Sequence, residues 1–199
     1  MQLDALIGSV LIQAPGCSDL LAVDALRKAA IQLCEQTSAW QESFTQSVRT
    51  QDVDLDVPEQ SRAVQILRVY VNGQRISPVT AGNADLFGQP GVPDSYYRTE
   101  DNVLRLIPAP SDAVSITADV VLAPLHTATA IPDDLANRCR AALIHGALAY
   151  LLAIPGHTWT QPVMAAAYLQ MFANEISVIS VHDNKSRVRA ALRVRSSYF

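Results

Sequence analysis

The fold is decided by a stretch that begins Ile131-Pro132-Asp133-Asp134 and runs to Ile179. Pro132 suits a first helical turn, where its missing N–H is no loss, and the two aspartates place negative charge beside the exposed N–H groups of that turn. Apolar residues then recur at spacings of three and four, which predicts two helices. The first stripe is Leu135, Cys139, Leu143, Gly146, Tyr150 and Ile154, and the second is Ala165, Leu169, Phe172, Ile176 and Ile179.

A corner separates the two predicted helices. Ile154-Pro155-Gly156 ends the first helix, Thr160 is expected to cap the second, and Pro162 fits its first turn. Both stripes are rich in alanine and glycine, which let two helices approach closely. The stretch therefore predicts an antiparallel helical hairpin. Its expected partner is a helix capped by Ser18 that runs from Asp19 to about Thr37.

The period of the apolar residues changes from three-and-four to two after Trp40, which indicates strands. Asn72-Gly73 lies between two apolar runs and predicts a tight β-hairpin, because both turn residues must accept positive φ. A long loop is expected from Pro78 to Ser95. About six strands are predicted, within residues 41–57, 63–71, 74–76, 96–99, 103–107 and 113–122.

The order of these elements predicts an α+β fold. A run of strands between helices argues against alternating βαβ units. We expect a helical bundle made of one N-terminal helix and the long C-terminal helical hairpin, formed by residues 1–40 and 125–199. An antiparallel β-sandwich or barrel-like domain, residues 41–124, is expected to be inserted into it.

Composition narrows the class of protein. The 199-residue chain is 49% apolar and 17% charged, which is less charge than the usual quarter, so either other subunits cover part of its surface or it is a simply apolar domain. A net charge of −4 argues against wrapping of nucleic acid over the whole surface. Three cysteines in no zinc spacing indicate reduced thiols. No apolar run is expected to span a membrane.

No motif in the sequence demands an enzyme, and we expect no catalytic residues, cofactor or metal. Phosphate-binding glycine loops, a nucleophile elbow and a His-Glu-x-x-His motif are all missing from the sequence. His145 lies mid-helix and is interpreted as a partnered core or groove histidine rather than a base. Asp52, Asp54 and Asp56 share one strand face, where a solvated surface is favoured over a cation site.

The C-terminal segment is basic and ends in two aromatic residues. It is either a solvated helix end or an arm that docks on a partner. The residues of this candidate docking arm are Lys185, Arg187, Arg189, Arg193, Arg195, Tyr198 and Phe199.

Several stretches, taken in order, resemble the head-to-tail adaptor (connector) proteins of tailed bacteriophages. They are Pro15-Gly16-Cys17, Ala25–Ala30 with Trp40, Val69–Gly73, Leu106–Pro110, Ile131–Leu135, Gly146–Leu152, Pro155-Gly156, Trp159–Pro162, Ala167-Tyr168 and Phe172. Each piece is generic alone, and the resemblance lies in their order and spacing across nearly the whole chain.

This resemblance implies a structural protein of the virion neck, made in the cytoplasm of the bacterial host. Members of such families form rings, usually of twelve copies, between portal and tail, and genomic DNA passes through the lumen without specific binding. The resemblance further implies that the helical bundle contacts the portal protein, that C-terminal segments reach into clefts between portal subunits, and that the β domain faces outward or toward the tail or next neck protein. Residues 185–199 are then the expected portal-docking arm.

Three other functions remain open. A tail-completion or tail-terminator protein would share the ring and contact the tail tube. A small-ligand-binding module or enzyme would use the loop Pro78–Ser95 and His126. A DNA-binding protein would use the arginines of the C-terminal segment, with strong salt dependence.

Overall fold

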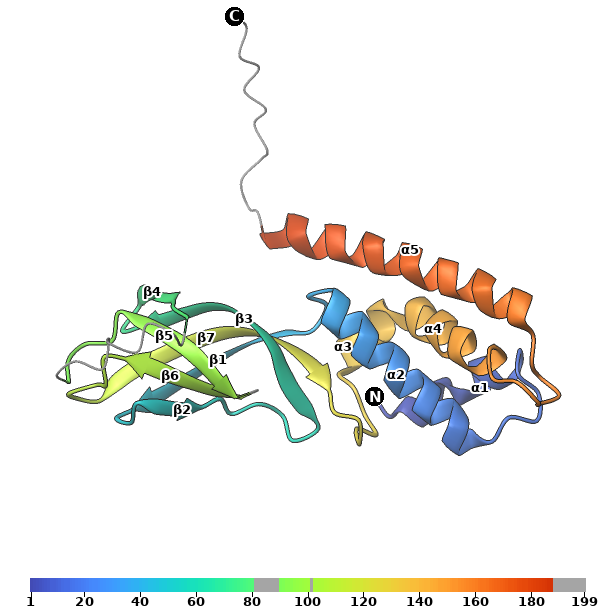
Figure 1. Ribbon diagram of the computed structural model, residues 1–199, viewed down its shortest axis with the longest axis horizontal. Helices are drawn as coiled ribbons and strands as arrows, with labels where there is room; N and C mark the ends of the chain where they lie inside the picture. The colour runs from blue at the N-terminus through green and yellow to red at the C-terminus, as the bar shows by residue number, and fades with distance from the viewer. Residues whose placement is uncertain (81–89, 101, 188–199) are drawn as a thin grey trace, which may run out of the picture.

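The computed structural model describes residues 1–80, 90–100 and 102–187. Figure 1 shows an elongated molecule with the helices at one end and the strands at the other. The helical elements are η1 (Leu3–Leu6), α1 (Ile7–Leu11), α2 (Asp19–Gln36), α3 (Asp133–Arg138), α4 (Arg140–Leu152) and α5 (Pro162–Arg187). The strands are β1 (Gln41–Val48), β2 (Asp52–Asp54), β3 (Ser61–Val71), β4 (Gln74–Pro78), β5 (Ser95–Glu100), β6 (Val103–Ile107) and β7 (Val114–Pro124).

The strands of the described residues form one nearly closed sheet in the order β1-β7-β3-β4-β5-β6-β2. The fold is therefore α+β, as predicted. The sheet is mixed and not wholly antiparallel, because β4 and β5 pair in parallel, with Ser77 opposite Ser95. A parallel pair requires a long connection that returns the chain to the same end of the sheet, and the connection from Pro78 to Ser95 has that length.

The predicted β-hairpin at Asn72-Gly73 is confirmed. Asn72 has φ +50° and Gly73 has φ +81°, and they join β3 to β4 in antiparallel register. The Asn72 side chain also accepts a 2.9 Å hydrogen bond from the backbone N–H of Ser115 on β7. The turn is thus tied to the neighbouring strand.

Helix α2 forms as predicted, and it supplies the centre of the helical part. Ser18 caps it by accepting a 3.4 Å hydrogen bond from the N–H of Leu21. Its buried residues are Ala22, Ala25, Leu26, Ala29, Ala30, Ile31, Leu33 and Cys34. This side packs against α4 and β7, so the core continues from the helices into the sheet.

The first residues form short helices rather than an extended arm. Leu3, Leu6 and Val10 are fully buried, and η1 and α1 pack against α2. The Pro132–Ile154 stretch, predicted as one helix, is broken at Cys139, whose φ of −107° and ψ of 17° leave the helical region. Beside the break, the Arg138 guanidinium donates to the backbone oxygen of Ala39.

The corner between α4 and α5 is held by Thr160, though not in the predicted way. Its hydroxyl donates to the Ile154 carbonyl at 2.6 Å and accepts from the His157 N–H at 3.1 Å. Helix α5 begins at Pro162, after Gln161, whose carbonyl accepts from the N–H of Ala165. Thr160 therefore stabilises the corner and does not cap the helix.

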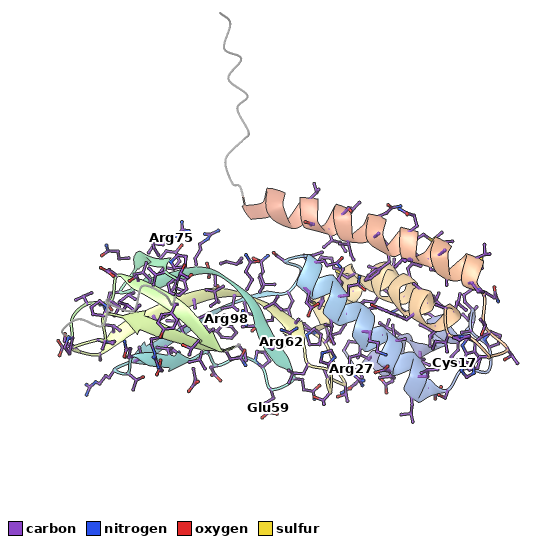
Figure 2. All side chains as sticks on the ribbon, in the orientation of Figure 1. Cys17, Arg27, Glu59, Arg62, Arg75 and Arg98 are labelled. Carbon is purple, nitrogen blue, oxygen red and sulfur yellow. The ribbon has the colours of Figure 1, made fainter. Side chains whose placement is uncertain are left out.

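Arginine side chains join the helices to the sheet, as Figure 2 shows for Arg27 and Arg62 at the junction. The Arg27 Nε donates to the carbonyl of Ala128 at 2.6 Å, in the connection that follows β7. Arg62 on β3 pairs with Glu35 of α2 at 2.5 Å. These contacts help to fix the orientation of the helices relative to the sheet, in addition to the apolar core that the two parts share.

Candidate assembly interface on the last helix

Helix α5 is covered on only part of its surface by the rest of the described structure. It is 26 residues long and lies along one side of the helical part, as Figure 1 shows. Between Pro162 and Val181 its buried residues are Ala165, Phe172 and Ile176, which face α4. The other sides of the helix are largely exposed.

The exposed sides of α5 carry large apolar side chains. Val163 is 83% exposed, Val178 69% and Leu169 54%, and Met164, Met171 and Val181 are exposed as well. The single charged residue from Pro162 to Val181 is Glu175. Exposed apolar side chains that follow one element without interruption by charge are typical of an interaction surface.

Glu175 is itself engaged within the chain. Its carboxylate oxygens lie 3.1 and 3.2 Å from Nδ1 of His145 on α4, and both side chains are less than a third exposed. The His145 ring also lies 5.6 Å from the Tyr168 ring, centroid to centroid. His145 is thus a partnered groove histidine, as predicted, and the charge of Glu175 faces α4.

A groove runs between α4 and α5 and encloses about 430 Å³. We call it the α4–α5 groove, and it is lined by Gln32, Gly146, Ala149, Tyr150, Ala153, Pro162, Ala165, Ala166, Leu169 and Phe172. The lining is apolar apart from Gln32 and the Tyr150 hydroxyl, which donates to Gln32 Oε1 at 2.6 Å. Such a surface fits apolar side chains better than a polar ligand.

By length and composition alone, the segment Pro162–Val181 of α5 is long and apolar enough to cross a membrane. It has 20 residues and a mean hydropathy of 1.2, so the expectation that no apolar run is long enough is wrong. Only 11% of an 18-residue window of this segment is buried. Its buried side packs on α4, and the described residues leave the remainder exposed.

The predicted docking arm is only partly within the described residues. Lys185 and Arg187 lie in the last turns of α5. Arg189, Arg193, Arg195, Tyr198 and Phe199 lie outside the described residues. The arm follows directly from the exposed helix, so the two features are continuous in the chain.

Two of the three aspartates predicted to share a strand face do share it, and the third does not. Asp52 and Asp54 lie on β2, whereas Asp56 follows the strand. Asp52 pairs with Arg105, with Nε–Oδ1 and Nη2–Oδ2 distances of 2.5 and 2.7 Å. Within the parts of the chain that the structure describes, no group of three or more possible metal ligands is present.

Asp52→Asn is expected to lower the free energy of unfolding slightly at pH 7. The hydrogen bonds from Arg105 hold the pKa of Asp52 below its usual value, so the pair stabilises the fold above pH ~4, and this contribution is lost as the pH falls through the lowered pKa. The carboxylate is 48% exposed, so we expect a loss of about 0.5 kcal/mol.

Urea denaturation at pH 7 and pH 3 measures this effect. The difference between wild type and variant should shrink at the lower pH. Asp54→Asn on the same strand is the control, because no ion pair of Asp54 is seen among the described residues. An equal loss for both variants would show that the Arg105 pair is not the cause.

The exposed apolar side chains of α5 were not predicted from the sequence, although the pattern that indicates them is present there. Val163, Met171 and Val178 lie off the predicted stripe. A helix that is apolar on more than one side is covered on more than one side. Of the residues expected to bind a small ligand, 81–89 of the long loop lie outside the described residues, and His126 does not line the α4–α5 groove.

A long helix with exposed apolar side chains is a feature typical of assembly subunits. The sequence matches the SU10 adaptor protein family over residues 1–195, and the chain belongs to this family of phage head-to-tail adaptors. It is therefore a virion component that contacts other head or tail components. No curated protein matches the sequence.

Proposed function

We propose that the chain is a structural head-to-tail adaptor that forms a ring, most simply of twelve copies, in the virion neck between portal and tail. The family match over residues 1–195 is the observation that carries this proposal. The uncovered apolar side of α5 supports it, because copies in a ring cover surfaces that a monomer exposes. The role is structural and requires no catalysis.

The two ends of the molecule correspond to two proposed contacts. Residues 1–40 and 125–199 act as a helical bundle, with α4 and α5 as its hairpin, and bind the portal protein. Residues 41–124 act as an inserted β domain that faces outward or toward the tail or next neck protein. The separation of helices and strands in Figure 1 supports this division.

DNA passes through the lumen of the proposed ring without specific binding. The net charge of −4 supports this step, because an acidic wall repels phosphates and lets the genome slide. The protein is made in the cytoplasm of the bacterial host before the neck is built.

The basic arm, Lys185 to Phe199, is proposed to dock in clefts between portal subunits. Its arginines suit acidic partners, and its two terminal aromatic residues suit an apolar pocket. Docking of the arm would add affinity once the ring meets the portal, because the second contact then forms within one complex.

Ending the chain after Arg187 is expected to abolish stable binding to the portal protein from the same genome while leaving the fold intact. Size-exclusion chromatography and electron microscopy of mixtures measure the binding. A control chain with Arg189, Arg193 and Arg195 all changed to glutamine keeps the aromatic end and separates charge from apolar docking. Undiminished binding of the shortened chain would contradict the docking role of the arm and leave the adaptor role standing. Binding to tails in place of portals would indicate a tail-completion protein.

A further inference from the structure

One flank of α5 carries a straight row of apolar side chains. Met164, Met171 and Val178 are spaced by seven residues and are 40%, 47% and 69% exposed. Seven residues make almost two helical turns, so the three side chains lie above one another over about 21 Å. We call them the apolar row.

The α4–α5 groove borders the other flank of the same helix. Ala166 and Leu169 line the groove and are both exposed. At 100° per residue, they lie about 140° and 200° around the helix from Met171. The row and the groove therefore face in nearly opposite directions.

The two surfaces are matched in chemistry, because both are apolar. The groove is lined by small side chains such as Ala149, Ala153 and Ala166, and no charged residue lines it. The row carries unbranched or small apolar side chains, and methionine adapts to irregular apolar holes. Glu175 lies near the row, and its carboxylate is paired with His145 of the same chain.

We propose that the apolar row of one copy packs into the α4–α5 groove of the next copy in the ring. The row and the groove lie on opposite flanks of one helix. Each copy can therefore insert its row into the groove of one neighbour and receive the row of the other neighbour in its own groove. Such a heterologous contact propagates from copy to copy and closes into a ring where the rotation allows. The proposal rests on the proposed ring and names the surfaces that build it.

The size of the contact fits an assembly that forms cooperatively. A row about 21 Å long on a helix about 10 Å wide presents on the order of 200 Å². This is about a quarter of the ~800 Å² that each partner buries in a stable pairwise interface. A pair of copies is then weak, while every copy in a closed ring makes the contact twice.

Cysteine cross-linking between unlike variants tests which surfaces meet. Met171→Cys chains mixed with Ala166→Cys chains are expected to form disulfide-linked heterodimers, measured on non-reducing gels with and without the portal protein. Cys17, Cys34 and Cys139 are buried and give little background. Met171→Cys mixed with Thr45→Cys, on β1 in the sheet, is the control and should not cross-link. Failure of the first pair in a sample whose rings are seen by microscopy would overturn the proposal.

Charge substitution tests the same contact through assembly. Met171→Asp and Ala166→Arg are each expected to abolish rings, because a charge must be buried at the contact. A mixture of the two variants should recover rings in part, because an unchanged row meets an unchanged groove at one contact and the introduced aspartate meets the introduced arginine at the next. Thr45→Asp should leave rings unchanged, and circular dichroism checks that each variant folds.

The outcomes separate this inference from the proposed function. Rings that bind the portal and survive both substitutions would overturn the row–groove contact and keep the adaptor. Copies that cross-link but never bind the portal would support the row–groove contact and contradict the proposed adaptor role. Wild-type chains that stay monomeric alone and with the portal, or that bind phosphatidylcholine vesicles through α5 in place of one another, would overturn both.

Discussion

Gly146→Leu is expected to lower the free energy of unfolding by about 3 kcal/mol or more, within the upper range for overpacked cores. A Cβ atom placed on Gly146 would lie 2.8 Å from Cβ of Ala29 and 3.1 Å from two ring carbons of Phe172. Ala29 is fully buried on α2 and has no flexible end that could move aside. The side chain would force α4 away from both α2 and α5, and urea denaturation measures the cost.

Two further variants show whether close approach is the reason. Gly146→Ala adds the clashing Cβ alone and should destabilise by a smaller amount. Gly8→Ala, in helix α1, places a Cβ with no neighbour within 4 Å and should be neutral or slightly stabilising, because alanine favours helix. Equal stability of Gly146→Leu and wild type would show that the three helices are not packed as described.

Phe172→Ala is expected to remove about 3–5 kcal/mol of stability, the range for a buried phenylalanine. Phe172 is 1% exposed and is the largest fully buried side chain among the described residues. It faces Gly146, so the ring fills the space that the missing side chain leaves. Hydrogen exchange should show protection of α5 falling further than protection of α2, because few other residues of α5 are buried.

Val163→Ala is the matched control on the same helix. Val163 is 83% exposed, and its truncation should change the stability by less than about 0.5 kcal/mol. If Phe172→Ala were as mild as this control, α5 would not be anchored on α4 through its ring.

Local signals were sufficient to predict several elements from the sequence. The Asn72-Gly73 turn specifies its own backbone, since both residues accept positive φ, and the hairpin is present. The stripe of α2 and its Ser18 cap are equally local, and that helix has the predicted bounds to within a residue. The family resemblance, carried by many short stretches in order, is confirmed by the family match.

Other features depend on contacts between distant residues and were not predictable in this way. The parallel pairing of β4 with β5 depends on where a long connection returns the chain. The break at Cys139 lies within an unbroken apolar stripe and is visible only in the backbone angles. The α4–α5 groove is lined by residues of α2, α4 and α5 that are distant in the sequence, so only the packed helices define it.

Electron cryomicroscopy of the full-length chain mixed with its portal protein tests the adaptor role most directly. We predict a closed ring of copies against the portal, with an axial opening wide enough for duplex DNA and with α5 of each copy against its neighbour. Portal particles without added density, or copies bound singly away from the axis, would contradict it.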